Sequence, residues 1–557
     1  MGITSEIITY ANRENRKITG FYDYTDCRPE NGLIIIPPAY GETKKDSLKV
    51  SYFLVKNGFN VIRYDSTCHV GESEGDMIDA DFEKMKNDIL STLDFAEKKF
   101  NAGTMGIVGS SLAVRTAIKA ASQDKRIRFL LGLVGIVDIR SALKTIYHQD
   151  VIGEILDNGY KGKTIDDIMG FEVSINFALS AIRNKYHDLE TTREDIRKVD
   201  IPIVLIAAEK DPWVNLIDVR ETLDLSPSTG KEFVVIPNAM HQLNENPEMA
   251  FFALQQTVIF TKKYLVHMDF TPGEVVVPSQ DEMSGQWKIE EERLKNLLQK
   301  NLEGEKAFWE KYLNKFVLIN KSRDYRDFLK LIYESMDIRQ GEYVLDAGCG
   351  NGHFGAWMLE SLIEKIFKER IDFEKFTVVN YLGLDFAENN LKEASFKHLN
   401  MLRRIYRELC IRERYRIIDY KYLPADLESP LPFAGNTFDK ICCNLVISYV
   451  KDPGFTVSEL FRVMKPGGKI VVSSMKPYAD LSLIYSNFAD QAEEPEEIDE
   501  ARKLLSAAGR IKQKENAGIY NFFPEEELFR FLDDAGAKNI KIVRAFANQA
   551  NLSVSEK

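Results

Sequence analysis

The sequence predicts an α/β protein made of two doubly wound domains, and three observations support this fold class. Short apolar runs alternate with amphipathic helical patterns in both halves of the 557-residue chain, as in mostly parallel sheets covered by helices. In each half a tight turn of small residues directly follows an apolar run, at residues 109–113 and 348–352. A stretch rich in proline, glycine and charge at residues 269–285 separates the halves.

The composition restricts the classes of protein that remain. Hydrophobic residues make up 44% of the chain, enough for full-sized cores, and the net charge of −12 disfavours a nucleic-acid partner. Six scattered cysteines form no Cys-x-x-Cys pair, so we expect neither a metal site nor a disulfide framework. A polar N-terminus and the lack of a long apolar run predict a cytoplasmic protein without a signal peptide or membrane span.

The first half is organised around the stretch MGIVGSSLAVRTA at residues 105–117. Residues 105–108 predict a buried strand and residues 114–121 predict a helix, with a sharp turn between them. A serine on such a turn exposes its hydroxyl beside the N–H groups of a helix N-terminus, as in the nucleophile elbow of α/β-hydrolases. Ser111 is the predicted nucleophile, because Gly109 and Ala113 are small residues two positions away on either side. A purely structural turn is the alternative.

The remaining elements of the first half complete a covered sheet. The loop Pro37-Pro38-Ala39-Tyr40-Gly41 follows an early strand, where α/β-hydrolases supply an oxyanion-hole N–H. We expect Ala39 or Tyr40 to provide that donor, and Leu112 to provide the second. The other expected strands are 32–36, 59–64, 129–137, 203–208 and 233–236, and the expected helices are 47–57 and 82–100.

A long insertion at about residues 138–200 is expected to form a helical lid over the site. Its apolar residues either line an acyl pocket or pack between helices, and the sequence leaves both interpretations open. These residues are Ile152, Ile155, Leu156, Phe171, Ile175, Phe177 and Leu179.

An acid and a histidine follow two later strands, in the order that this fold requires. Asp211 comes just after the strand 203–208, and His241 comes just after the strand 233–236. The chain order Ser111, Asp211, His241 matches that of α/β-hydrolases. Serine needs a base to accept its proton, and the base needs a carboxylate to orient its imidazole. The three residues together predict a catalytic triad.

Several longer motifs carry a family resemblance over about residues 5–268. They are IPPAYGETKKD, NGFNVIRYDSTCHVGESEG, SSLAVRTA, LVGIVDIRSAL and AAEKDPWV. With them, the first half resembles the acyl-transferase (thioesterase) subunit of the bacterial bioluminescence fatty acid reductase complex. The resemblance implies cleavage of long-chain acyl groups from acyl carrier protein through an acyl-serine at Ser111. This chain departs from that family because it continues well beyond residue 270.

We expect the first domain to span residues 1–268, a linker and spacer helix to span 269–300, and the second domain to span 301–557. The second domain begins its sheet with a strand at 343–346, followed by the pattern Gly-x-Gly-x-Gly and a helix from His353. A second strand, 381–385, ends in an acid that can accept both hydroxyls of a ribose. The segments PADL at 424–427, FDKICCN at 438–444 and KPGGKIVV at 465–472 follow in order.

These four motifs resemble a class I S-adenosylmethionine-dependent methyltransferase over about residues 320–548. The resemblance implies S-adenosylmethionine as cofactor, in a Rossmann-like fold. The residues it places around the cofactor are Asp346, Gly348 and Gly350 at the methionine and ribose end, Asp385 at the ribose, Asp426 and Leu427 at the adenine, and Asn444 facing cofactor and substrate. A nicotinamide-binding domain and a degenerate, non-binding copy are the alternatives.

The methyl acceptor is expected to be a small molecule, but the sequence does not identify the pocket that would bind it. Residues 478–488 and 519–523 supply aromatic and apolar side chains that either contact it or pack in the core. We find no convincing general base, which leaves open an acceptor that is already ionised, such as a carboxylate.

The leading hypothesis is a bifunctional enzyme in which Ser111 takes an acyl chain from acyl carrier protein or a similar thioester. The second domain then methylates the product or another intermediate of the same pathway. In one alternative the methyltransferase makes a methyl ester of a carrier-bound acid and the hydrolase cleaves it, as in biotin precursor synthesis. In another, the first half is a non-catalytic acyl-binding scaffold.

Overall fold

The computed structural model describes residues 2–25, 32–159, 165–299, 308–310, 312, 322–411, 415–480, 484–485, 487–488 and 508–557. The first unit holds Met1–Lys300 and Ala508–Gly518, and the second holds Asn301–Ala507 and Ile519–Lys557. The first unit thus continues through the stretch 269–300, which the sequence analysis treated as a linker and spacer helix. It also includes a short segment from far along the second half of the chain.

An eight-stranded sheet is the centre of the first unit, in the order β1-β2-β4-β3-β5-β6-β9-β10. Strand β2 is antiparallel to both of its neighbours, and the other neighbouring pairs are parallel. This is the predicted mostly parallel sheet, preceded by an N-terminal hairpin that the sequence analysis missed. The strands are β1 (Ile3–Ala11), β2 (Lys17–Thr25), β3 (Leu33–Ile36), β4 (Asn60–Tyr64), β5 (Met105–Ser110), β6 (Ile127–Leu133), β9 (Ile203–Ala208) and β10 (Lys231–Ile236).

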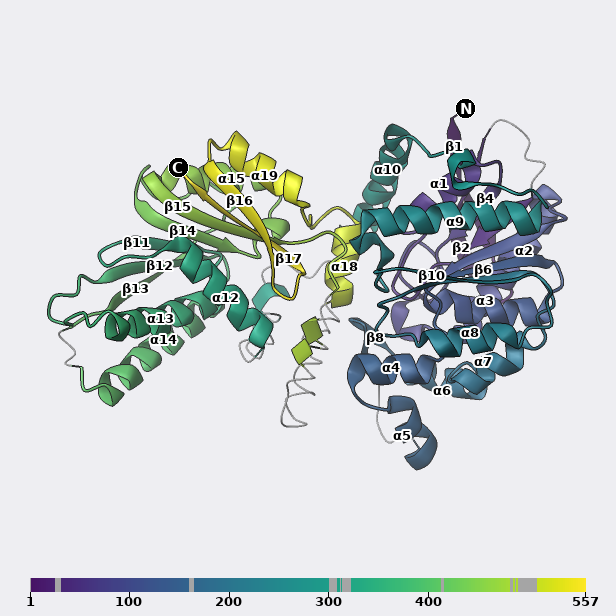
Figure 1. The fold of residues 1–557 in the computed structure, drawn as a ribbon, viewed down its shortest axis with the longest axis horizontal. Coiled ribbons are helices and arrows are strands. Elements are labelled where there is room, and N and C mark those ends of the chain that lie inside the picture. Colours follow the sequence, from purple (N-terminus) through teal and green to yellow (C-terminus); the bar gives the residue numbers. More distant parts are fainter. Residues whose placement is uncertain are drawn as a thin grey trace. The chain divides into compact units, whose positions relative to one another are not determined.

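Helices cover both faces of this sheet, and consecutive residues of β3 belong to different cores. Ile35 packs in the core with α2, α3 and α8, while Ile34 and Ile36 pack in the core with α1 and α9. Burial on both faces explains why β3 is an unbroken apolar run. In Figure 1, α9 lies along one side of the sheet and α3 and α8 lie along the other. The helices are α1 (Leu48–Lys56), α2 (Phe82–Phe100), α3 (Leu112–Gln123), α8 (Leu216–Asp224) and α9 (Pro247–Leu265).

The insertion between β6 and β9 is mostly helical, as expected for the lid, and it also contains a short hairpin that was not predicted. A hairpin joins β7 (Ile165–Ile168) to β8 (Phe171–Val173). Met169 and Gly170 both have positive φ, 53° and 84°, as a two-residue hairpin turn requires. Strands this short leave little alternation in the sequence to predict them. The helices are α4 (Ile139–Tyr147), α5 (Val151–Asn158), α6 (Asn176–Arg183) and α7 (Leu189–Ile196).

Helix α10 (Gln280–Gln299) is bound to the first unit by buried charges. The Arg63 guanidinium on β4 lies 2.7 Å from the Glu290 carboxylate, and the two side chains are 0% and 2% exposed. Arg63 also pairs with Asp23 on β2 at 2.5 Å. Nearer the surface, Arg293 pairs with Glu72 at 2.8 Å. The helix expected as a spacer therefore packs as part of this unit.

A seven-stranded sheet is the centre of the second unit, in the order β13-β12-β11-β14-β15-β17-β16, with β17 antiparallel to both neighbours. Helices α12, α13 and α14 share one core, and α15 and α19 share the other, on opposite sides of the sheet (Figure 1). The strands are β11 (Tyr343–Ala347), β12 (Val379–Asp385), β13 (Ile418–Pro424), β14 (Phe438–Asn444), β15 (Met464–Met475), β16 (Lys538–Ala545) and β17 (Ala550–Glu556). The helices are α12 (Arg323–Met336), α13 (His353–Lys368), α14 (Glu388–Glu408), α15 (Pro453–Val463) and α19 (Glu525–Asp534).

Candidate active sites

Ser111 stands between the end of β5 and the first residue of α3. Its backbone has φ 49° and ψ −123°, a conformation that costs a non-glycine residue about 1–3 kcal/mol. The Ser111 N–H donates to the Leu133 carbonyl at 2.9 Å, and the Ser111 carbonyl accepts from the Ile136 N–H at 3.2 Å. These two bonds, to the last residue of β6 and to the loop after it, hold the strained turn in place. The geometry is that of a nucleophile elbow.

The three residues predicted from chain order lie together at the ends of β5, β9 and β10. The Ser111 Oγ is 2.9 Å from the His241 Nε2, and the His241 Nδ1 is 2.6 Å from the Asp211 Oδ2. The His241 and Asp211 side chains are 3% and 1% exposed. In this arrangement the imidazole can accept the serine proton while the carboxylate stabilises the imidazolium.

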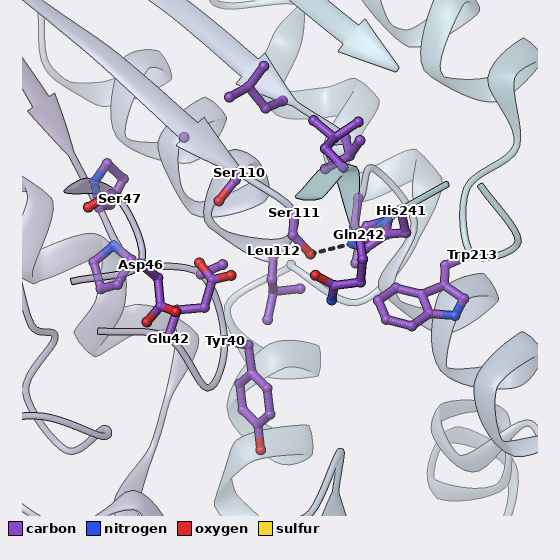
Figure 2. Close-up of a pocket in the computed structure, with 18 of the residues that line it drawn as sticks. Tyr40, Glu42, Asp46, Ser47, Ser110, Ser111, Leu112, Trp213, His241 and Gln242 are labelled. Atoms are coloured by element: carbon purple, nitrogen blue, oxygen red, sulfur yellow. Dashed lines mark hydrogen bonds between the residues drawn. The ribbon is translucent and has the colours of Figure 1, made fainter. Parts of the chain in front are cut away.

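Trp213 is a site residue that the sequence analysis did not assign. Its ring centroid lies 4.2 Å from that of His241, and its backbone N–H donates to the Asp211 Oδ1 at 2.9 Å. Figure 2 shows Trp213 beyond His241, on the side away from Ser111. Trp213 therefore contacts both His241 and Asp211. Its position two residues after Asp211 was the feature of the sequence that could have indicated a place in the site.

The loop between β3 and α1, residues 37–47, carries the predicted oxyanion donors and is held in a defined shape. Gly41 has φ 76°, and its N–H donates to the His69 Nε2 at 3.1 Å. The Ala39 carbonyl accepts from the Glu42 N–H at 3.1 Å. Burial lowers the pKa of His69 to about 4, so the ring is neutral and can accept this bond at pH 7. No role for His69 was predicted.

Leu112, the second predicted donor, is the first residue of α3. The first N–H groups of a helix have no partner within the helix, so this donor is suited to an oxyanion. Ala39, Tyr40 and Leu112 all line the pocket that contains Ser111 and His241.

The pocket encloses about 230 Å³, and most of its wall is apolar. Ile36, Val108 and Leu133 of the sheet contribute to the wall, together with Ile139 and Ile146 of α4. Figure 2 shows Glu42 and Asp46 in the same cavity. Burial and the neighbouring Asp46 carboxylate raise the pKa of Glu42 to about 7. An apolar wall around a serine fits an acyl chain.

The insertion between β6 and β9 lines this pocket, but mostly with residues that were not predicted. Of the seven apolar candidates, Phe177 lines the pocket, and the other six do not line it in the described part of the chain. Ile152 and Ile155 on α5 are buried in packing, and Leu156 is 45% exposed. The apolar face of α4 takes their place. Residues 160–164 of the lid lie outside the described residues.

In the second unit, the glycine-rich turn after β11 has the backbone that its sequence predicts. Gly348, Gly350 and Gly352 have φ values of 76°, 52° and 77°. A Cβ at Gly348 would lie 2.5 Å from the Val446 side chain, so no larger residue fits there. The turn leads directly into α13. A tight glycine turn before a helix N-terminus fits close approach by a cofactor.

Asp385 ends β12 and is bonded to this turn. Its Oδ2 accepts from the Gly350 N–H and its Oδ1 accepts from the Ala387 N–H, both at 2.9 Å. Burial raises the pKa of this carboxyl above its usual value. Each carboxylate oxygen has a further lone pair that could accept a ribose hydroxyl.

Four other predicted residues lie around the same ends of the strands. Asp346 accepts from the Tyr381 hydroxyl at 2.7 Å, and burial raises its pKa to about 6. Asp426 is exposed and Leu427 is buried, just beyond the end of β13. The Asn444 Oδ1 at the end of β14 is buried without a hydrogen-bond partner among the described residues. An unpartnered buried acceptor beside a glycine turn and a carboxylate fits a polar cofactor such as S-adenosylmethionine.

The strand order of the first unit and its serine elbow, with an acid and a histidine after later strands, define an α/β-hydrolase. The chain belongs to the acyl transferase family, whose model matches residues 7–299. A model described as a methyltransferase domain matches residues 338–523. Both resemblances inferred from the sequence are confirmed, and the second unit is a class I methyltransferase domain. Both units therefore belong to classes of protein that are enzymes.

Relatives of the first half include acyl transferases of the genera Photobacterium and Aliivibrio. That of Photobacterium phosphoreum is 27% identical over 248 residues, which cover 43% of this chain and 78% of the relative. That of Aliivibrio fischeri is 24% identical over 303 residues, which cover 53% of this chain and 95% of the relative. A structure of Est1E from Butyrivibrio proteoclasticus with ferulic acid bound has 18% identity and a TM-score of 0.40, covering 46% of this chain and 99% of its own. No helix among the described residues is long and apolar enough to cross a membrane.

Proposed function

We propose that the first unit transfers acyl groups from a thioester through an acyl-serine at Ser111. The hydrogen-bonded series Ser111, His241 and Asp211 is the observation that carries this proposal. The Ser111 Oγ attacks the thioester carbonyl as its proton passes to the His241 Nε2. The carbon–sulfur bond then breaks, and the imidazolium returns the proton to the leaving thiolate. In the second half of the reaction, water or another nucleophile gives its proton to His241 and attacks the acyl ester. The bond from the acyl carbon to the Ser111 Oγ then breaks, and the imidazolium returns the proton to that oxygen.

The charge that develops on the carbonyl oxygen needs two donors. We assign them to the N–H of Leu112 and to that of Ala39 or Tyr40, which line the pocket beside Ser111. Removal of one such donor typically costs about 3–4 kcal/mol of transition-state stabilisation. The apolar pocket wall supports a fatty acyl substrate, and the kinship with acyl transferases supports an acyl carrier protein or a similar thioester as its source.

Ser111→Ala tests the nucleophile. The variant is expected to lose turnover of acyl-carrier thioesters and of nitrophenyl esters, and to lose covalent labelling by a fluorophosphonate probe. Ser110→Ala, at the neighbouring position, should keep the label. Equal labelling of Ser111→Ala and wild type would refute the assignment. It would favour instead a scaffold that binds acyl chains without reacting with them.

For the second unit, we propose methyl transfer from S-adenosylmethionine. When bound, this cofactor supplies an electrophilic methyl group on its sulfonium. Asp385 would accept hydrogen bonds from the ribose, and the Gly348–Gly350 turn would approach the methionine end. Asp426 and Leu427 would contact the adenine, and the free Asn444 Oδ1 would face cofactor and acceptor. The carboxylate already oriented by two N–H groups is the main support.

Calorimetric titration with S-adenosylmethionine tests this assignment. Asp385→Ala is expected to bind at least tenfold more weakly, because hydrogen bonds to a charged group are each worth about 1.5–3 kcal/mol. Asp419→Ala is the matched control, because Asp419 lies near the opposite ends of the same two paired strands. Unchanged affinity in Asp385→Ala would remove that residue from the site.

We also propose that the two activities serve one fatty-acyl or polyketide-like pathway, since one chain carries both. The released acyl product, or a later intermediate, would be the methyl acceptor. Of the segment 478–488 considered for the acceptor, residues 481–483 and 486 lie outside the described residues. Mass spectrometry of the carrier after incubation with S-adenosylmethionine tests the order. A methyl group gained on the carrier-bound acid would support the alternative methyl-ester cycle.

A further inference from the structure

A short helix from the second half of the sequence is part of the first unit. Helix α18 (Ala508–Asn516) follows β15 and precedes β16, two strands of the methyltransferase sheet. It nevertheless groups with the first unit, where it contacts α10 and β8. The first unit is therefore built from two separate stretches of the chain.

The last residue of α18 binds the loop that carries the predicted oxyanion donors. The Asn516 Nδ2 donates to the two carboxylate oxygens of Asp46, at 3.2 and 3.1 Å. The Asn516 carbonyl accepts from the Lys45 Nζ at 2.5 Å. Asn516 is 8% exposed and Lys45 is 1% exposed. One residue thus holds two neighbouring positions of the loop, through its side chain and its backbone.

Hydrogen bonds continue from this contact along the loop. The Asp46 Oδ2 accepts from the Thr43 N–H at 2.8 Å and from the Thr43 Oγ1 at 3.1 Å. Asp46 also lines the pocket that contains Ser111. The carboxylate held by Asn516 therefore holds the turn that follows Gly41 and Glu42, close to the predicted donors at Ala39 and Tyr40.

The other end of α18 supports the same loop through the lid hairpin. A Cβ at Gly509 would lie 2.4 Å from the Gly170 carbonyl oxygen, so the helix packs directly on the hairpin backbone. The neighbouring Phe171 ring lies against Gly41, where a Cβ would be 2.6 Å from it. It also meets the Tyr40 ring edge-on, with centroids 5.9 Å apart. Both ends of α18 therefore contact the surroundings of the loop.

We propose that Asn516, supplied by the methyltransferase half of the sequence, is a positioning residue for acyl transfer in the first unit. This inference rests on the proposed function at Ser111. Oxyanion donors stabilise a transition state when they are held in place before the reaction. The bond from Asn516 to Asp46 limits the movement of the loop that presents them. Loss of this bond weakens transition-state stabilisation without altering the apolar wall that binds the acyl chain.

Asn516→Ala in the 557-residue chain tests the proposal, with Gln513→Ala on the same helix as the control. We expect kcat for a nitrophenyl acyl ester to fall about fivefold with KM unchanged, the effect of losing one buried hydrogen bond that acts in the transition state. Gln513→Ala should match wild type. Equal kcat values for the two variants would overturn the proposal. If the wild-type chain itself does not turn over the ester, the function proposed at Ser111 is rejected instead.

Two further measurements separate positioning from a general loss of stability. Hydrogen exchange of the amides of residues 39–47 should be faster in Asn516→Ala than in Gln513→Ala, with exchange in β5 and β9 unchanged. The exchanged pair Asp46→Asn with Asn516→Asp restores a donor and an acceptor, and it should recover part of the kcat that each single substitution loses. Uniformly faster exchange, or no recovery in the double variant, would contradict a positioning role.

Discussion

At the scale of single residues, His69 is hydrogen-bonded to the loop that carries the predicted oxyanion donors of the first unit. Its ring is buried and accepts the Gly41 N–H, and a bond of this kind needs an imidazole without a proton on Nε2. The pKa of His69 is lowered by burial from 6.5 to about 4. Protonation would turn the acceptor into a donor facing the Gly41 N–H.

This shift predicts a pH dependence of stability with a definite sign. Between pH 6.5 and about 4 the unfolded chain binds a proton at His69 and the folded chain does not. The free energy of unfolding therefore falls as the pH is lowered through this window, by up to about 3 kcal/mol from this residue. Urea unfolding at several pH values should show a smaller fall in His69→Gln, whose amide oxygen can accept the same bond. His398, with its pKa lowered to about 4, remains in both proteins. Identical pH profiles would contradict the prediction.

Residue roles could be predicted where chain order carries information. Ser111, Asp211 and His241 each follow a predicted strand, and the structure brings their side chains within hydrogen-bond distance. His69 and Asn516 give no such signal. Their roles depend on partners 28 and 470 residues away along the chain.

At the scale of elements, α10 was predicted as a helix, but its packing against the first unit was not predicted. Its charged sequence suggested a spacer helix between the domains, yet Glu290 is 2% exposed and pairs with the fully buried Arg63. Periodicity along a helix indicates which face is apolar. It does not indicate that a buried arginine on a distant strand needs a second carboxylate.

Removal of this buried charge is expected to destabilise the first unit strongly. Arg63→Met leaves Asp23 and Glu290 without their shared cation, and a broken buried pair typically costs about 3–5 kcal/mol. Arg293→Met is the control, because Arg293 lies on α10 near Glu290 but its pair with Glu72 is partly exposed and should contribute less than about 1 kcal/mol. Urea unfolding followed by fluorescence checks both variants. A similar fall in the free energy of unfolding for both variants would show that burial of the Arg63 pairs adds nothing to their contribution to stability.

At the scale of the whole molecule, the chain passes between its two units three times, near residues 300, 507 and 518. Each unit has its own pair of cores, one on each face of its sheet. Separate cores of this size are expected to unfold as separate cooperative transitions.

Calorimetry of the full chain should therefore show two transitions, and S-adenosylmethionine should raise the midpoint of one of them. At a free concentration 100 times its Kd, a ligand stabilises the unit that binds it by about 2.7 kcal/mol. Asp385→Ala should reduce this shift and leave the other transition unchanged. One transition that moves as a whole would show that the units unfold together.

The sequence by itself determined the two fold classes and the order of most strands and helices, and it supplied the predictions of catalytic and cofactor-binding residues. These features can be predicted from local sequence patterns, because apolar periodicity and small residues at turns depend on a few neighbouring positions. The tertiary structure decided that α10 and α18 belong to the first unit, that α4 contributes to the pocket wall, and that His69 and Asn516 are hydrogen-bonded to the loop after β3. Those outcomes depend on burial and hydrogen bonding between residues far apart in the chain, which no local pattern records.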